Sequence, residues 1–162
     1  MKKHYPLIFK GIGRESFFSF LLHNGISSID YIPTSEEGKT FYITVKTTTG
    51  IYIEIDSSSM STPLWNEAST ISISIIDKKE VPELAYDSWP ITSGKWIENI
   101  YLAILSSDEF TSESGIIISG NDENLWICST GIPGEMTIKS NSKTEFFDPE
   151  HPIENYHISK LI

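Results

Sequence analysis

The amino-acid sequence predicts an α+β fold that is mostly β, with antiparallel sheet built around two similar hairpin units and one short N-terminal helix. The stretch from Ile116 to Ile138, IIISGNDENLWICSTGIPGEMTI, holds two apolar runs separated by Asn121–Asn124, then a Gly-Pro-Gly bend and a third run. This is the pattern of a β-hairpin followed by another strand. An earlier stretch from Phe41 to Ile55, FYITVKTTTGIYIEI, has the same outline. The other segments are expected to cover these two hairpins and form their edges.

The helix is predicted between Arg14 and Asn24, because large apolar residues recur there at i, i+3 and i+4. Gly25 is expected to end this helix in a left-handed conformation. The aromatic stripe could line a ligand pocket, but such stripes more often pack against a sheet, and we expect core packing. The apolar residues concerned are Phe17, Phe18, Phe20, Leu21 and Leu22.

Strands are predicted where apolar and polar residues alternate, which happens at 41–46, 51–56 and 71–75. A further strand is expected at 26–32, ended by Pro33. The segment 57–68 is expected to be a polar loop.

Three later segments are harder to assign. Residues 77–94 are not periodic and contain Pro82 and Pro90, which predicts a connection between halves. Residues 96–105 fit either a helical face or a strand buried on both faces, and their isoleucine and tyrosine content favours a strand. The C-terminal piece, 145–162, is expected to wrap an edge.

An internal duplication is suggested by a displacement of 74 residues, which carries the first hairpin onto the second. The chain is therefore expected to be a single domain, 1–162, with possible pseudo-repeat halves 26–76 and 96–140. Two alternating hairpins in any β protein would match about as well, so the duplication is a hypothesis.

Cysteine content and apolar runs indicate the cellular compartment. Cys128 is the single cysteine, which excludes an intramolecular disulfide and a metal cage built from cysteines. No apolar run approaches the roughly 20 residues that cross a bilayer, and the start of the chain lacks a signal-peptide core. We expect a soluble cytoplasmic protein without a membrane partner.

The formal net charge is −10, which argues against nucleic acid as a partner, because phosphate binding depends on basic patches. Residues 81–162 hold four basic and thirteen acidic side chains. This excess can be a solvated face that keeps the protein soluble, or a docking face for a basic partner.

No motif for catalysis is present. Cys128 lies in a predicted strand without a nearby cation, which predicts a buried inert thiol. Gly11-Ile12-Gly13 lacks the rest of a phosphate-binding motif, and no serine nucleophile elbow occurs. A metal site at the C-terminus is disfavoured by its spacing and by Pro152. The side chains that such a metal site would use are Asp148, Glu150, His151, Glu154 and His157.

Aromatic residues suggest a protein-binding site. Trp96 and Trp126 are expected in the core. Tyr86 and Trp89 lie in the irregular PELAYDSWP loop among acidic residues, as expected of a hot spot for a cationic protein surface.

The second half of the chain carries a W-I-x-x-I-Y-L segment, then G-I-I-I-S-x-x-x-E-N-L-W-I, then G-I-P-G-E-M-T-I. With these segments, the compact, acidic, cysteine-poor chain resembles the immunity proteins of bacterial polymorphic and contact-dependent toxin systems. The resemblance implies a protein that binds and blocks a cognate toxin, often a basic nuclease, without catalytic residues or a cofactor.

The sequence therefore predicts a non-enzymatic inhibitor whose negative potential is concentrated on one side of the molecule. The alternatives are a small-molecule or carbohydrate-binding β module, marked by exposed tryptophans in a concave face, and a small hydrolase, marked by a carboxyl group of raised pKa in a pocket. The expected partner-binding residues are Glu83, Tyr86, Asp87, Trp89, Asp108, Glu109, Glu113, Asp122 and Glu123.

Overall fold

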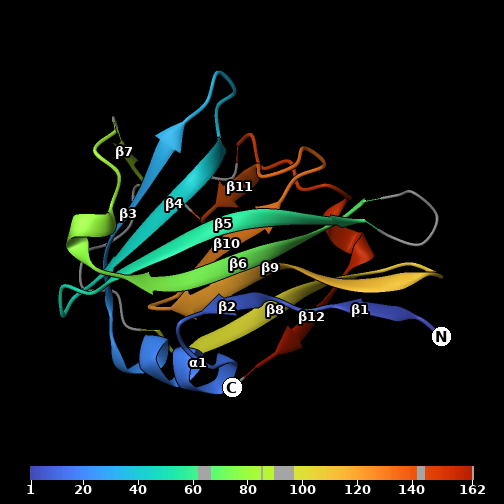
Figure 1. Ribbon diagram of the computed structural model, residues 1–162, viewed down its shortest axis with the longest axis horizontal. Helices are drawn as coiled ribbons and strands as arrows, with labels where there is room; N and C mark the ends of the chain where they lie inside the picture. Colours follow the sequence, from blue (N-terminus) through green and yellow to red (C-terminus); the bar gives the residue numbers. More distant parts are fainter. Residues whose placement is uncertain (62–66, 85, 90–96, 142–144, 162) are drawn as a thin grey trace.

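The computed structural model describes residues 1–61, 67–84, 86–89, 97–141 and 145–161. The fold is mostly β, with one α-helix in the described part and a curled sheet (Figure 1). In chain order the elements are β1 (Lys3–Tyr5), β2 (Ile8–Lys10), α1 (Arg14–His23), β3 (Ile26–Pro33), β4 (Lys39–Thr47), β5 (Tyr52–Ser61), β6 (Glu67–Ile76), the 3₁₀ turn η1 (Lys78–Glu80), β7 (Asp87–Ser88), β8 (Asn99–Ser106), β9 (Phe110–Gly120), β10 (Glu123–Ser129), β11 (Met136–Lys139), the 3₁₀ turn η2 (Ile153–Asn155) and β12 (Tyr156–Lys160).

The sheet follows the order β12-β8-β9-β10-β11-β4-β5-β6-β2. Two strands turn the sheet back on itself because each has two partners along one side. On the side of β4 opposite β3, the start of β4 pairs with β11 and its later part with β5. On the side of β9 opposite β8, β1 pairs with the start of β9 and β10 with the rest. The result is two half-sheets that face each other, one containing β4, β5 and β6 and the other containing β8, β9 and β10.

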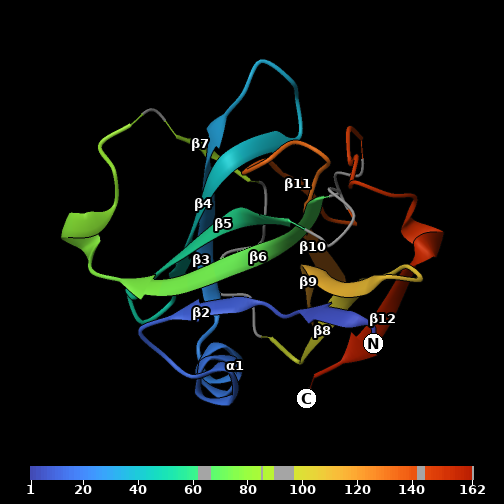
Figure 2. The same ribbon diagram turned by 45° about the vertical axis from the view of Figure 1, so that its right-hand side comes forward.

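The N-terminal segment joins the two half-sheets. Its β1 runs parallel to β9, and its β2 runs parallel to β6. Figure 2 shows this blue segment running below β6 and above α1 toward the β8–β9 region. These ten residues therefore close the curl.

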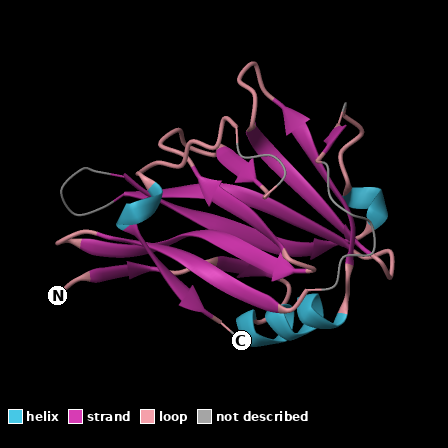
Figure 3. Cartoon of the chain, turned by 180° about the vertical axis from the view of Figure 1, so that it is seen from behind, coloured by secondary structure: helices cyan, strands magenta, loops and turns pink. Residues whose placement is uncertain are grey.

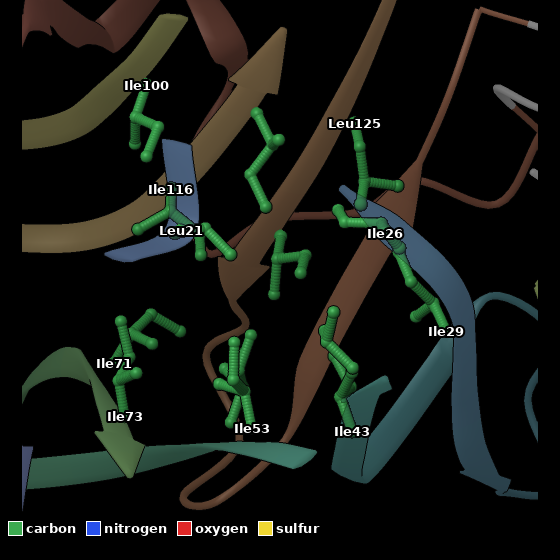
Figure 4. Packing of buried hydrophobic residues seen from close by; sticks show 14 of the residues in the cluster. Leu21, Ile26, Ile29, Ile43, Ile53, Ile71, Ile73, Ile100, Ile116 and Leu125 are labelled. Carbon is green, nitrogen blue, oxygen red and sulfur yellow. The ribbon is translucent and has the colours of Figure 1, made fainter. Parts of the chain in front are cut away.

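The core fills the space between the half-sheets (Figure 4). Each fully buried isoleucine or leucine there contributes about 1.5–3 kcal/mol relative to exposure, so the facing rows are the main source of stability. The buried side chains include Ile53 and Ile55 of β5, Ile71 and Ile73 of β6, Ile100 of β8, Ile116 and Ile118 of β9, and Leu125 and Ile127 of β10.

Helix α1 lies along one end of the sheet (Figure 3) and confirms the predicted segment. Phe17, Phe18 and Leu21 are buried in the core, as expected. The predicted terminator is wrong, because Gly25 is not among the glycines with positive φ. The Asn24 side chain instead donates a hydrogen bond to the Phe20 carbonyl at 2.7 Å, which satisfies an otherwise unpaired C-terminal carbonyl.

Both predicted hairpins are present. The β9–β10 turn consists of Asn121 and Asp122, with φ of 53° and 59°, the left-handed pair that suits a two-residue hairpin. The β4–β5 turn ends at Gly50, whose φ is 82°. Residues 99–106 form a strand, as favoured, and β12 pairs with β8, so the C-terminal piece does cover an edge.

One loop prediction is wrong at its ends. Residues 57–61 continue β5, and β6 begins at residue 67, within the predicted loop 57–68. The serines of this segment carry no alternation of hydropathy, yet their backbones pair along the whole hairpin. Backbone pairing does not require apolar side chains.

Both halves contain a three-stranded antiparallel meander, β3-β4-β5 and β8-β9-β10. Their registers differ, however. In the first meander Ile43 pairs with Ile55, and a displacement of 74 would pair Ile117 with Ser129. Ile117 in fact pairs with Trp126.

In the part of the chain that the structure describes, no helix has the length and apolar character needed to cross a bilayer.

Candidate functional site

The expected acidic face is divided by strand β9. Asp108 and Glu109 precede this strand, whereas Asp122 and Glu123 follow it. A strand of 11 residues separates the two pairs by about 35 Å. These four acidic residues therefore lie at opposite ends of the sheet and do not form one continuous surface.

Glu113 is an internal residue. Its side chain is 5% exposed and accepts two hydrogen bonds from the Arg14 guanidinium, at 2.6 and 2.9 Å. The backbone N–H of Leu7 donates a third, at 2.7 Å. This carboxylate ties the N-terminal segment and the start of α1 to β9 and is not presented to a partner.

The predicted aromatic loop is only partly exposed. Trp89 is 3% exposed and belongs to the core, where its ring lies edge-on to Tyr31 at 6.1 Å. Tyr86 is half-buried against Tyr42, with ring centroids 6.3 Å apart. Glu83 and Asp87 are exposed. Trp65 and Trp96 lie outside the described residues.

A different acidic surface forms around the β3–β4 loop, residues 34–38. We define the acidic rim as the exposed carboxylates of Glu36, Glu37, Asp87 and Asp148, which gather around this loop; the nearby Glu135 side chain is only 5% exposed. The ammonium of Lys39 lies among them, 2.7 Å from Glu36, 3.2 Å from Asp148 and 3.8 Å from Glu135. Among the described residues, four exposed carboxylates against this one ammonium leave a negative excess at the surface.

Local hydrogen bonds shape the loop. The hydroxyl of Thr34 accepts a hydrogen bond from the Glu36 N–H and donates to the Glu36 carbonyl, at 3.1 and 2.9 Å. Gly38 has a φ of 77°, and a Cβ atom on it would lie 2.9 Å from the Phe146 Cβ. The absence of a side chain at Gly38 thus allows the segment 145–148 to approach the loop.

Strand β11 fastens the 145–148 segment to the loop. The Thr137 hydroxyl donates to the Gly38 carbonyl at 3.1 Å and accepts a hydrogen bond from the Asp148 N–H at 3.2 Å. Asp148 is thereby held beside Lys39 although the two residues are far apart in sequence.

Large exposed apolar side chains accompany the rim. Phe41 is 49% exposed, Ile132 46% and Phe146 52%. Phe146 lies against Gly38, and the Phe41 ring would lie 3.6 Å from a Cβ on Gly134, two residues after Ile132. Exposed apolar groups bordered by charge are typical of protein-binding surfaces.

Two clefts flank the loop. One, of about 380 Å³, is lined by residues that include Tyr31, Glu37 and Asp87. The other, of about 290 Å³, is lined by Glu36, Glu37, Lys39, Phe146 and Asp148. Each cleft brings carboxylates together with an aromatic ring, an arrangement that suits a lysine or arginine side chain.

The electrostatic environment agrees with this geometry. The hydrogen bond with Glu36, followed by the Asp148 interaction, raises the pKa of Lys39 and outweighs the opposing effect of burial. Burial, then the charges of Asp87 and Glu37, raises the pKa of Tyr31. Negative charge therefore reaches both sides of the loop.

Sequence reasoning placed only Asp87 in this rim. Glu36 and Glu37 stand in a short loop, and Asp148 follows two phenylalanines, so none belonged to the acidic stretch that drew attention. The sequence signal that could have indicated this site is the pair of adjacent aromatic residues, Phe146-Phe147, directly before an acidic residue.

The groups considered for catalysis lie elsewhere. Cys128 is buried, as predicted, and burial raises the pKa of its thiol to about 12. Burial also raises the pKa of Asp56, the sign expected of a hydrolase, but Asp56 lies 3.8 Å from Lys10 on a sheet face and lines neither cleft of the rim. Among the described residues, no group of three or more His, Cys, Asp or Glu side chains could hold a metal ion.

Trp126 is half-buried rather than in the core. The ammonium of Lys139 lies over the Trp126 ring, 4.6 Å from its centroid. Together with Tyr101 and Asn124, Trp126 lines a shallow hollow of about 290 Å³.

Comparisons with protein-family models, curated proteins and solved structures found no match to this chain.

Proposed function

We propose that the protein is a non-enzymatic binding domain that docks a basic protein on the acidic rim, and that it acts as an immunity protein against a toxin. The observation that supports this proposal is the coincidence of four exposed carboxylates with three exposed apolar side chains around one loop. Resemblance to immunity proteins in the second half of the chain agrees with it.

The carboxylates and the apolar side chains of this surface are expected to have different roles in binding. The carboxylates raise the rate of encounter with a cationic surface and orient it. Phe41, Ile132 and Phe146 then supply apolar anchors, and a few anchor residues carry most of the binding energy in protein interfaces. A nuclease presents a basic cleft, and an acidic rim can occupy that cleft in place of phosphate.

The location and origin of the chain are proposed on separate grounds. A single cysteine suits the reducing cytoplasm, where an immunity protein meets its toxin. The two antiparallel meanders suit descent from one strand–loop–hairpin unit, with later changes of register.

The experiment is affinity capture from cells that carry the gene, using the wild-type protein and two rim variants, Asp148→Lys and Phe146→Ala. Asp148 is 73% exposed and Phe146 52%, so both variants are expected to fold. We expect the wild type to capture a basic protein at one-to-one stoichiometry, with affinity that falls as salt rises. Each rim variant should lose most of that affinity.

Matched controls carry the same chemistry away from the rim. Asp108→Lys reverses an exposed charge at the β8–β9 turn, and Ile158→Ala removes an apolar side chain that is 38% exposed on β12. Both should bind like the wild type. Equal binding by Asp148→Lys and the wild type, or loss of binding with Asp108→Lys alone, would contradict the proposal.

Inhibition is tested with the captured protein itself. Expressed alone, it is expected to arrest growth, and coexpression with the wild type should restore growth whereas coexpression with Asp148→Lys should not. A captured protein that is harmless would support binding and refute the immunity role.

A further inference from the structure

We propose that the cavity between the β8–β9 turn and the segment 150–155 binds a small organic cation, a primary amine or guanidinium on a short aliphatic chain. This site lies apart from the acidic rim and does not rest on the function proposed above. Figure 2 shows the yellow β8–β9 turn next to the red η2 turn, which supply the two walls.

The cavity has the size and lining of a ligand site. Its volume is about 600 Å³, within the range of cavities that hold small molecules. Ser106 and Glu109 line one wall, Glu150 and His151 the other, and Leu105 and Phe110 supply the apolar part.

Glu109 provides the reason for a cationic ligand. Its Oε2 atom is buried and has no hydrogen-bond partner among the described residues. A carboxylate oxygen removed from water without a donor is unfavourable. A charged N–H donor offsets this cost and forms one of the stronger kinds of hydrogen bond. With Glu150 on the facing wall, the cavity disfavours anions.

The protein itself binds an ammonium group on this wall. Lys2 Nζ donates to the Ser106 hydroxyl at 2.7 Å. An amine that enters the cavity can reach the same wall and the unpaired oxygen of Glu109.

The cavity is formed before any ligand binds. The Ser107 hydroxyl accepts hydrogen bonds from the N–H groups of Glu109 and Phe110, at 3.3 and 3.2 Å, and fixes the turn. On the other wall, the Tyr156 hydroxyl accepts one from the His151 N–H at 3.3 Å. The floor belongs to a buried cluster in which the Phe110 ring lies edge-on to Tyr5, with centroids 5.9 Å apart. Little ordering is therefore needed on binding, which favours affinity.

The test uses 1,5-diaminopentane as the probe, with 1-pentanol and pentanoate as neutral and anionic counterparts. Binding is measured by calorimetry and located by amide chemical shifts. We expect the diamine to bind and to shift amides of 105–110 and 150–155, while pentanol and pentanoate do not bind. Glu109→Gln should weaken the diamine about tenfold or more, because it removes the negative charge that strengthens the hydrogen bond to the ammonium.

Asp108→Asn is the matched control, because it removes the same charge from the adjacent exposed position. It should change the Kd by no more than about twofold, since exposed charge is screened. Asn155→Lys, which places an ammonium at the cavity wall, should abolish binding even if Glu109→Gln proves unstable. Absence of diamine binding, equal binding of pentanol, or equal weakening by Asp108→Asn and Glu109→Gln would overturn the proposal.

Discussion

Removal of the Arg14 guanidinium tests whether the internal ion pair with Glu113 holds the closed sheet together. In Arg14→Ala, the Glu113 carboxylate stays buried and keeps the Leu7 N–H as a donor, but it loses two charged hydrogen bonds. Removing one partner from a buried pair costs about 3–5 kcal/mol. Because the Arg14 side chain is 35% exposed, we expect the lower end, about 3 kcal/mol.

The second variant separates the pair from its surroundings. Glu113→Gln keeps an acceptor for Leu7 and loses the charge, for which about 2 kcal/mol is expected. In the double variant no buried carboxylate is left unpaired, so the two losses should not add. A coupling free energy of at least about 1 kcal/mol is expected between the two positions.

The assay is equilibrium urea unfolding of the wild type, both single variants and the double variant. Lys79→Ala is the control, because its 3.7 Å pair with Asp77 is exposed and should contribute less than about 0.5 kcal/mol. If Arg14→Ala destabilises no more than this control, or if the single effects add, the ion pair does not perform the structural role described above.

Three further predictions concern single positions. Burial raises the pKa of Asp56 above 3.8. The contribution of Asp56 to the free energy of unfolding therefore grows as pH falls through the folded pKa and is complete below the unfolded pKa. By urea unfolding, Asp56→Asn should be more stable than the wild type at pH 7 and should show no such gain at about pH 3. Cys128 is buried with a pKa of about 12, so the native protein should react with a thiol reagent at pH 8 only as fast as it unfolds, and rapid labelling of the folded protein would refute this. Gly115→Ala should destabilise by about 1–3 kcal/mol, because its Cβ would lie 2.5 Å from Cys128 Sγ and 2.8 Å from the Ile127 carbonyl oxygen; an unchanged urea midpoint would show that the strands separate freely.

The strands that could be predicted are those in which hydropathy alternates, such as 41–46 and 71–75. The start of β9 could not be, because Thr111–Ser114 is polar and resembles a loop. Ser112 and Ser114 are nevertheless fully buried, and both donate to the Ser69 carbonyl, at 2.6 and 3.0 Å. Their burial depends on contact with β6, more than forty residues away in the sequence, which no local pattern reveals.

The candidate site was hidden for a similar reason. Charge counted along the chain favoured 83–123, but Glu36 and Asp148 meet only because β11 pairs with the start of β4. Conversely, Glu113 was expected to bind a partner, but its carboxylate forms an internal ion pair with Arg14. Linear charge density records neither the long-range pairing nor the internal neutralisation.

The way in which β1 and β2 close the sheet governs how the chain can fold. Lys3 pairs with Phe110 and Ile8 with Ser72, so β1 and β2 are synthesised well before the strands with which they pair. Contacts between such distant segments require loop closure before they give any stabilisation, and proteins rich in them fold in about milliseconds to seconds rather than microseconds. Until Phe110 has emerged, β1 has no strand to pair with, a period in which a chaperone would protect the unpaired strand from another chain.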